Sequence, residues 1–422
     1  MLTKAYSDSR PTPIASVPLS RRALLARSLG LATAAGPRPS QLMHAQDATP
    51  VPPSEEAFPA EVQLQLTQVV ETALAETSTP GALVGVWVPG RGNWTMAAGI
   101  GDLATAAPMS FADHVRIASI TKTFTATVVL QLVEEGVLSL DDRLGHFITG
   151  IPNGDGITIR QLLGMSAGIY NYIHDPLIAV DYVADPLLPF TPEQVVDIVR
   201  AHGEADFPPD TEVRYSDSNY VLLGLIIEQV TGRSVAAEIT DRIILPLGLT
   251  GTSYPDTPEM PAPYAHGYLG EQRGDPLRDV TRSNPAVAAA AGAMISTVAD
   301  LKTWAAALST GALLSPALQA ERLAVRPFAQ SPAAGYGLGV LDAFGFLGHS
   351  GGIFGYSSWM LYDPDTRATL VMVTTRASTE GGTADPILAG ILHLLFPGRL
   401  PDIPGPDVVA PDSATPVATP MA

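Results

Sequence analysis

Two side chains that could carry out nucleophilic chemistry, Ser119 and Lys122, lie three residues apart. On a helix this spacing places a hydroxyl and an amine on the same face. The pair opens an apolar run, Phe124–Val133, whose largest side chains recur at helical spacing, and Gly136 provides a stop. The sequence therefore predicts a helix whose first turn holds Ser119. Unpaired backbone N–H groups and the helix dipole would favour the negative charge of a reacting alkoxide there.

The lysine is unusual for this chain, because only three of its 24 Lys and Arg residues are lysine. Arginine keeps its proton inside proteins, whereas a partly desolvated lysine can release its proton and act as a base. Ser119 and Lys122 also form the only Ser-x-x-Lys in the sequence. An ordinary N-cap serine followed by a lysine that reaches solvent explains the same spacing. The spacing alone does not separate these two interpretations.

Composition limits the classes of function. A chain of 422 residues with 46% hydrophobic residues can bury a large core, and its length predicts two or three domains or one large composite domain. A net charge of −18 makes nucleic acid and anionic membranes poor partners. The absence of cysteine excludes disulfides, a thiol nucleophile and thiolate metal sites. Motifs for metals, dinucleotides and phosphates are also missing, so we expect neither a metal nor a cofactor.

The N-terminus has the form of a twin-arginine export signal. Arg21 and Arg22 precede a mildly apolar stretch of small residues that ends near Ala35. Arg27 interrupts this stretch, which is too short to span a bilayer, so no membrane span is expected. We predict export to the periplasm or the extracellular space. The alternative is an arginine-bearing tail that carries no address.

The remaining chain shows helices in the middle and strands towards both ends. Residues 59–77 have helical periodicity, and 82–88 and 93–98 are strand-like segments around a Pro-Gly turn, typical of a hairpin. Helices are expected at 159–163, 192–202, 220–231, 236–244, 297–308 and 316–324. Strands are expected at 337–342, 345–347, 356–362 and 368–374, followed by a helix at 385–395.

Two strands cannot make a stable sheet alone, so the N-terminal hairpin should pair with the C-terminal strands. The expected fold class is α+β, with an antiparallel sheet built from both chain ends, flanking helices and an inserted, mainly helical domain. The expected divisions are an export signal and spacer (1–45), a disordered linker (46–57), a sheet domain (58–139 and 330–398), a helical domain (140–329) and a disordered tail (399–422).

Two further stretches could contribute to a site. Tyr215-Ser216-Asp217 leads directly into an apolar helix, where packing of the tyrosine and N-capping by Asp217 are the ordinary explanations. The glycine-rich stretch 347–352 surrounds His349 and would let another molecule approach the backbone closely.

Ser166 and Ser350 each stand in a Gly-x-Ser-x-Gly pattern, which is the nucleophile elbow of α/β-hydrolases. The elbow requires a strand before the serine and a helix after it, and neither serine has that setting. After Ser350 only His393 could serve as the histidine. We therefore do not expect an elbow.

Taken in order, Ser119-Ile120-Thr121-Lys122, Tyr215-Ser216-Asp217 and His349-Ser350-Gly351 resemble the serine β-lactamase and penicillin-binding-protein superfamily. The likeness covers about 60–398 and is greatest to the branch of class C β-lactamases, D-alanyl-D-alanine carboxypeptidases and esterases. The fold that this resemblance implies agrees with the organisation expected above.

The resemblance also implies roles for individual residues. Ser119 would be the acylated nucleophile, and Lys122 and Tyr215 would share the duties of general base and acid. The backbone N–H groups of Ser119 and Gly352 would form the oxyanion hole. His349 would be the fourth catalytic residue.

Two residues depart from the family pattern. Asp217 stands where the family usually has an asparagine, and an ionised carboxylate can only accept hydrogen bonds. Asp217 could instead pair with Lys122. His349 stands where β-lactamases usually have a lysine, so the grip of the His349-Ser350-Gly351 edge on a substrate carboxylate should be weaker.

The sequence thus predicts an exported, cofactor-free serine hydrolase that forms an acyl-enzyme on an amide or ester of a small-molecule or peptide substrate. An esterase of the same fold is one alternative. A penicillin-binding-like domain that only binds peptide or a partner is another, which an intact Ser119, Lys122 and Tyr215 set disfavours.

Overall fold

The computed structural model describes residues 56–270, 274–329, 331–377 and 382–400, and every statement below concerns those residues. The predicted export signal lies outside them, as do most of the predicted linker and tail. None of the described helices is long and apolar enough to cross a membrane.

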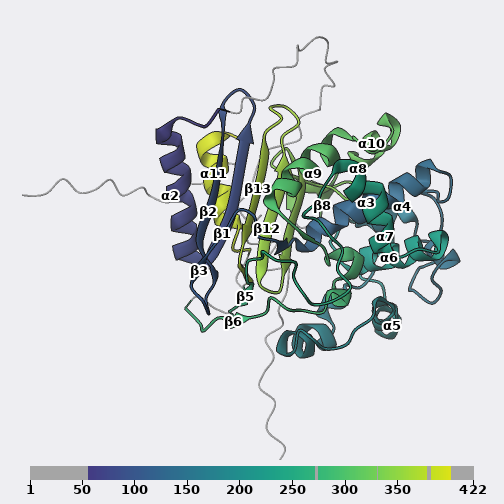
Figure 1. Cartoon of the computed structure of the whole chain (residues 1–422). Helices are drawn as coiled ribbons and strands as arrows, with labels where there is room; N and C mark the ends of the chain where they lie inside the picture. The colour runs from purple at the N-terminus through teal and green to yellow at the C-terminus, as the bar shows by residue number, and fades with distance from the viewer. Residues whose placement is uncertain (1–55, 271–273, 330, 378–381, 401–422) are drawn as a thin grey trace, which may run out of the picture.

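An antiparallel sheet of nine strands forms the centre of the molecule (Figure 1). In spatial order the strands are β3 (Ala107–Pro108), β2 (Gly92–Asp102), β1 (Gly81–Val88), β13 (Thr369–Thr374), β12 (Tyr356–Tyr362), β11 (Phe346–Ile353), β10 (Leu341–Ala343), β9 (Ser331–Tyr336) and β8 (Arg326–Phe328). The N-terminal hairpin joins the C-terminal strands where β1 pairs with β13, with Ala82 opposite Thr374. The predicted sheet from both chain ends is confirmed.

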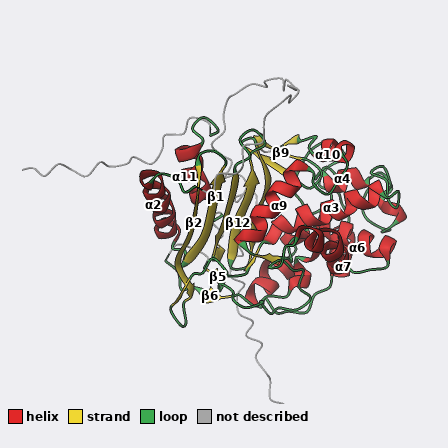
Figure 2. Cartoon of the chain, turned by 45° about the horizontal axis from the view of Figure 1, so that its top comes forward, coloured by secondary structure: helices red, strands yellow, loops and turns green. Residues whose placement is uncertain are grey.

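Helices cover both faces of this sheet. On one face α2 (Ala60–Thr77) packs against β1, β2 and α11 (Asp385–Leu395). On the other face α9 (Val298–Thr310) crosses β11, β12, β13 and β1, so the sheet lies between the two layers (Figure 2). Every residue of β12 and β13 is buried, which is the pattern of central strands that are covered on both sides.

The remaining helices cluster beside the sheet (Figure 2). They are α3 (Thr121–Glu134), α4 (Ile159–Leu163), α5 (Pro192–His202), α6 (Ser218–Thr231), α7 (Val235–Ile239), α8 (Leu245–Leu247) and α10 (Pro316–Arg322). Short strands complete the fold: β4 (Val115–Arg116) pairs with β7 (Ile295–Ser296), and β5 (Tyr268–Leu269) lies between β6 (Arg278–Asp279) and β14 (Arg376–Ala377).

The helix α3 is buried along most of its length between α6, α7 and the turns next to it. Its threonine hydroxyl groups find acceptors on nearby backbone: Thr123 Oγ1 donates to Ile120 O and Thr127 Oγ1 to Thr123 O, each at 2.7 Å, and Thr125 Oγ1 donates to Ala290 O at 2.8 Å. Because these hydroxyl groups are satisfied within the protein, this part of the helix can be buried. It therefore holds its first turn rigidly.

One strand expectation is wrong. Residues 337–340 are not in a strand but form the turn between β9 and β10, in which Gly337 N donates to Val340 O at 2.8 Å. Gly339 has φ of 81° in this turn, and a Cβ atom there would collide with Ala126 of α3. A glycine is required at this position by both the backbone conformation and the close contact.

Candidate active site

Ser119 lies in a short 3₁₀ turn, η1 (Ala118–Ile120), which runs directly into α3. The serine was expected in the first turn of the α-helix. It lies instead in the tighter turn immediately before that helix. Ala118 has φ of 51°, in the left-handed region that non-glycine residues rarely adopt. Such a conformation costs roughly 1–3 kcal/mol and is typical of functional sites, where the surrounding packing enforces it. Strands β11 and β12 pack on η1 and supply that packing.

Lys122 is fully buried, and its Nζ atom has three hydrogen-bond partners. They are Ser119 Oγ at 3.2 Å, Asp217 Oδ1 at 2.7 Å and the carbonyl oxygen of Ala291 at 2.7 Å. Three acceptors match the three N–H donors of an ammonium group. A neutral amine fits as well, with its two N–H groups on the carboxylate and the carbonyl and its lone pair facing the serine hydroxyl. A proton can therefore pass between Ser119 and Lys122 without movement of either side chain.

Asp217, the last residue of the second motif, is buried and pairs with Lys122 as the sequence suggested. Asn171 holds the other side of this residue. Its Nδ2 donates to Asp217 Oδ2 at 3.3 Å, and its Oδ1 accepts from the backbone N–H of Asp217 at 3.1 Å. The two hydrogen bonds fix the carboxylate in front of the lysine.

Tyr215 approaches the lysine through the face of its ring. Lys122 Nζ lies 5.0 Å from the ring centroid of Tyr215, a distance at which the cation and the ring attract each other. The ring of Tyr215 also lies 6.2 Å from that of Tyr336, nearly perpendicular to it, and 6.1 Å from that of His349. Three of the four side chains predicted to be catalytic, Ser119, Lys122 and Tyr215, thus lie in one cluster, and the ring of the fourth, His349, lies next to that of Tyr215.

His349 lies on β11 with its side chain buried. Its Nδ1 lies 2.5 Å from the carbonyl oxygen of Ser350, and its Nε2 lies 2.9 Å from the hydroxyl of Tyr336. A carbonyl can only accept, so Nδ1 carries the hydrogen, and in the neutral ring Tyr336 donates to Nε2. Burial raises the pKa of the Tyr336 hydroxyl well above its usual value, so that group keeps its proton. Both ring nitrogens are therefore used within the protein.

The rest of the third motif, Ser350 and Gly351, lies in the part of β11 that packs on η1. A Cβ atom on Gly351 would collide with the carbonyl oxygen of Ile117 and with Ser358 Oγ. Gly351 thus allows the two backbones to touch. Gly352 is exposed, with open space where a side chain would stand, and Ser350 is half-buried opposite Trp359. An oxyanion hole made from the N–H groups of Ser119 and Gly352 requires this close approach.

The structure adds three residues that sequence reasoning missed. Asn171 contacts Asp217, which lies 46 positions further along the chain. The carbonyl oxygen of Ala291 contacts Lys122 across 169 positions. Met165 Sδ accepts a hydrogen bond from the backbone N–H of Ser216 at 3.5 Å and so helps to fix the backbone of the second motif. The sequence around Asn171 contains no signal of this role, because its contact with Asp217 forms only in the folded chain.

Neither serine of the Gly-x-Ser-x-Gly patterns has the setting of an elbow. Ser166 is buried in the turn after α4, where its backbone N–H donates to Gln161 O at 2.9 Å. Ser350 lies inside β11. Neither is followed by a helix, so the structure agrees with the expectation against an elbow.

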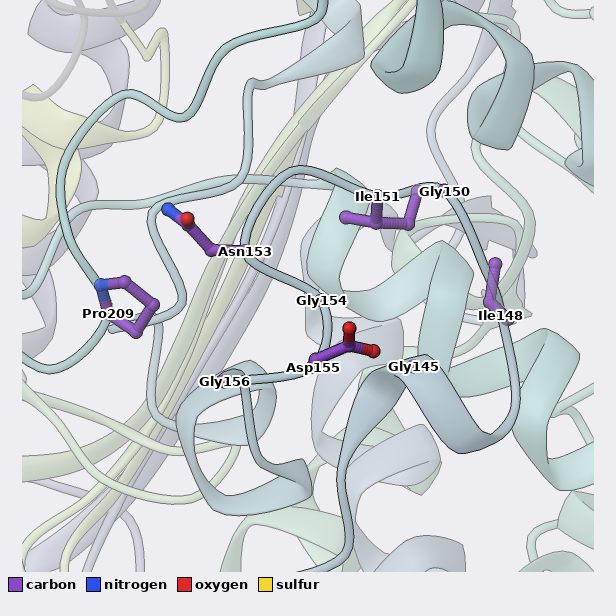
Figure 3. A pocket seen from close by; sticks show the side chains of 9 residues that line it. All are labelled: Gly145, Ile148, Gly150, Ile151, Asn153, Gly154, Asp155, Gly156 and Pro209. Atoms are coloured by element: carbon purple, nitrogen blue, oxygen red, sulfur yellow. The ribbon is translucent and has the colours of Figure 1, made fainter.

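A pocket of about 390 Å³ opens elsewhere on the surface, next to the loop that precedes α4 (Figure 3). Its lining contains none of the predicted site residues and consists of Gly145, Ile148, Gly150, Ile151, Asn153, Gly154, Asp155, Gly156 and Pro209. Asp155 is its one titratable side chain. The pocket shares no residue with the cluster around Ser119 and offers no nucleophile of its own.

Comparison with known proteins agrees with the motifs. The family model described as Beta-lactamase matches residues 66–393. This chain belongs to the beta-lactamase family. The family resemblance and the fold class predicted from the sequence are both confirmed.

Several relatives cover most of the matched region. Penicillin-binding protein 4 of Amycolatopsis lactamdurans is 29% identical over 357 residues, which cover 80% of this chain and 90% of that protein. D-aminopeptidase of Brucella anthropi is 27% identical over 325 residues, which cover 76% of this chain and 60% of that protein. The crystal structure of a D-stereospecific amidohydrolase from Streptomyces sp. is 35% identical with a TM-score of 0.69, covering 77% of this chain and 97% of that one. Hydrolases are thus among the relatives that share this fold.

Proposed function

We propose that the protein is a serine amidohydrolase that forms an acyl-enzyme on Ser119 and cleaves amide bonds next to D-amino acid residues. The observation that carries this proposal is the 3.2 Å contact between Lys122 Nζ and Ser119 Oγ inside a buried cage. A nucleophile in contact with a group that can take its proton is the signature of covalent acyl transfer. The family model and the amidohydrolase relative support the same reaction class.

In the acylation step, the neutral amine of Lys122 takes the hydroxyl proton as Ser119 Oγ attacks the carbonyl carbon. The O–C bond forms, and the carbonyl π electrons move onto the oxygen. The N–H groups of Ser119 and Gly352 would stabilise the resulting oxyanion. The ammonium formed on Lys122 stays in contact with Asp217 and Ala291 O, which already accept its other two hydrogens.

Collapse of this intermediate breaks the C–N bond of the substrate, and the leaving amine takes the proton that Lys122 received. Tyr215, whose ring lies against the lysine, is placed to share this transfer. Water then attacks the acyl ester with Lys122 again as the base. The reverse proton movement releases the acid and restores Ser119.

The proposed substrate class rests on the relatives and on the third motif. A D-aminopeptidase and a D-stereospecific amidohydrolase are among the proteins most similar to this chain. Because both nitrogens of His349 are bonded within the protein, we expect a weak grip on a substrate carboxylate. A D-amino acid amide therefore fits better than a D-alanyl-D-alanine peptide.

Export is a second proposal, and it rests on Arg21 and Arg22 and on the mildly apolar stretch of small residues after them. Fractionation of cells that express the full chain tests it. The Arg21→Lys, Arg22→Lys double variant should stay inside the cell, and export of that variant would contradict a twin-arginine route.

Intact-mass spectrometry after exposure to a β-lactam and to an activated ester, followed by peptide mapping, tests the nucleophile. One adduct on Ser119 is expected, and Ser119→Ala should abolish it. An adduct on Ser166 or Ser350 would contradict the proposal. Turnover of D- and L-phenylalanine amide and of p-nitrophenyl acetate then tests the substrate class. Hydrolysis of the ester alone would identify an esterase, and binding without turnover would identify a binding domain.

A further inference from the structure

We propose that Asp217 is a positioning residue that makes a three-membered relay of Ser119, Lys122 and Asp217. In this relay the carboxylate holds the lysine and stabilises the ammonium that forms when the lysine takes the serine proton. This inference rests on the proposed function. It assigns to Asp217 the part that an aspartate plays towards histidine in other serine hydrolases.

The hydrogen bonds identify Asp217 as an ionised carboxylate. Its Oδ1 accepts from Lys122 Nζ at 2.7 Å, and its Oδ2 faces Asn171 Nδ2 at 3.3 Å. The orientation of the asparagine amide is fixed, because Asn171 Oδ1 must face the backbone N–H of Asp217. Both carboxylate oxygens thus meet donors. A protonated carboxyl would place its own O–H against one of them.

The surroundings leave Asp217 as the group that sets the charge of the lysine. In the part of the chain that the structure describes, Asp217 is the sole carboxylate in an ion pair with Lys122. From α6, Tyr220 presents its ring 5.7 Å from Lys122 Nζ, and burial raises the pKa of its hydroxyl far above the usual value. Tyr215 presents its ring at 5.0 Å. His349 stands behind Tyr215 and is held between a carbonyl and a hydroxyl.

Other charged groups that pack on α3 are engaged elsewhere. Arg322 of α10 donates to Thr127 Oγ1 at 2.7 Å, and burial lowers the pKa of its guanidinium to about 9. Glu238 of α7 is buried and forms ion pairs with Arg233 and Arg242. Neither Arg322 nor Glu238 contacts Lys122, so the lysine and Asp217 form one local charge pair.

This pair has a consequence for catalysis that a neutral asparagine would not have. A carboxylate at 2.7 Å stabilises the ammonium that forms as the lysine takes the serine proton. Asp217→Asn keeps the shape of the side chain but removes this charge, so the acylation rate constant should fall by roughly tenfold or more. The KM for a neutral ester should stay nearly unchanged, because Asp217 acts on the lysine and not on the substrate.

The test compares the wild type with Asp217→Asn and with Glu238→Gln. The control removes the charge of a buried, ion-paired carboxylate that lies outside the site. Pre-steady-state acylation by a p-nitrophenyl ester is followed at pH 7.5 over a range of ester concentrations, which separates the acylation rate constant from the KM. We expect the loss of the rate constant in Asp217→Asn alone, with the KM unchanged. An unchanged rate constant in Asp217→Asn, or an equal loss in Glu238→Gln, would overturn the relay. Failure of the wild type to acylate on Ser119 would instead overturn the proposed function.

Asn171→Ala tests the relay even if Asp217→Asn does not fold. It removes the donor at Asp217 Oδ2 and leaves the 2.7 Å ion pair in place, so the carboxylate is held less firmly in front of the lysine. We expect a smaller loss of the acylation rate constant than in Asp217→Asn, again at unchanged KM. An unchanged rate constant in Asn171→Ala would refute the positioning of the lysine through this carboxylate.

Discussion

Removing one member of the buried pair of Lys122 and Asp217 should cost far more stability than removing both. Lys122→Met keeps the length of the side chain but takes away its charge. The lysine side chain is fully buried and that of Asp217 is 6% exposed, so water cannot replace the lost partner. The carboxylate would keep the 3.3 Å hydrogen bond from Asn171 but lose its ion pair. Breaking a buried pair on one side costs about 3–5 kcal/mol, and we expect a loss of unfolding free energy in that range.

The double variant Lys122→Met, Asp217→Asn removes the stranded charge. An asparagine amide is neutral and close in shape to the carboxylate, so the remaining cost is that of unmade hydrogen bonds, about 1–3 kcal/mol. The sum of the two single losses should therefore exceed the loss of the double variant by at least about 2 kcal/mol, the size of coupling between residues in direct contact.

The assay is urea unfolding at pH 7.5, followed by the fluorescence of the four tryptophans. Ser119→Ala serves as the control, because it removes only the 3.2 Å hydrogen bond to Lys122 and leaves the charges in place. A loss below about 1 kcal/mol in Lys122→Met, typical of an exposed pair, would show that Asp217 is not a buried charge. Additive losses in the double variant would show that the two residues are not coupled, and either result would refute the reasoning.

Three other variants test separate parts of the structure. Burial raises the pKa of the Asp385 carboxyl to about 6, so its stability contribution is full below pH 4 and lost as pH rises through 6. Asp385→Asn, which keeps an acceptor for Trp359, should gain about 3 kcal/mol relative to the wild type between pH 4 and 7.5 in urea unfolding. Gly351→Ala should push β11 away from Ile117 and slow acylation by roughly 10²-fold in stopped-flow assays, with unchanged circular dichroism. Met165→Leu removes the sulfur acceptor under the second motif, and we expect roughly tenfold lower kcat/KM at nearly constant Tm.

The parts of the fold with strong periodicity could be predicted from the sequence. The helix expected at 59–77 is α2, and the strand expected at 356–362 is β12 with the same bounds. Pairing of β1 with β13 followed from the instability of a lone hairpin. The turn at 337–340 could not be predicted in this way, because apolar residues between glycines resemble a strand. Its conformation depends on contact with α3, which local sequence does not show.

The candidate site likewise has contacts that could be predicted from the sequence and contacts that could not. The motif residues Ser119 and Lys122 were predictable, because their contact depends on local helical spacing. The hydrogen bond from Lys122 to the carbonyl of Ala291 was not, because any residue type could supply that oxygen. Asn171 reaches Asp217 only through tertiary packing. The boundaries of the two predicted domains stay a prediction, although α9 of the helical stretch packs on the sheet and α3 packs among the helices.

The aspartate of the second motif also explains why the chain keeps a lysine where it otherwise uses arginine. An arginine paired with Asp217 would remain charged at every accessible pH and could never take a proton from Ser119. A lysine paired with a neutral asparagine would release its proton easily but would hold less firmly the one it accepts. Lys122 with Asp217 combines a group able to lose a proton with a fixed counter-charge at 2.7 Å. The carboxylate faces Lys122 and Asn171, and Gly352 is an exposed residue next to the third motif, so we expect the selectivity of this protein to reside in the residues around Gly352.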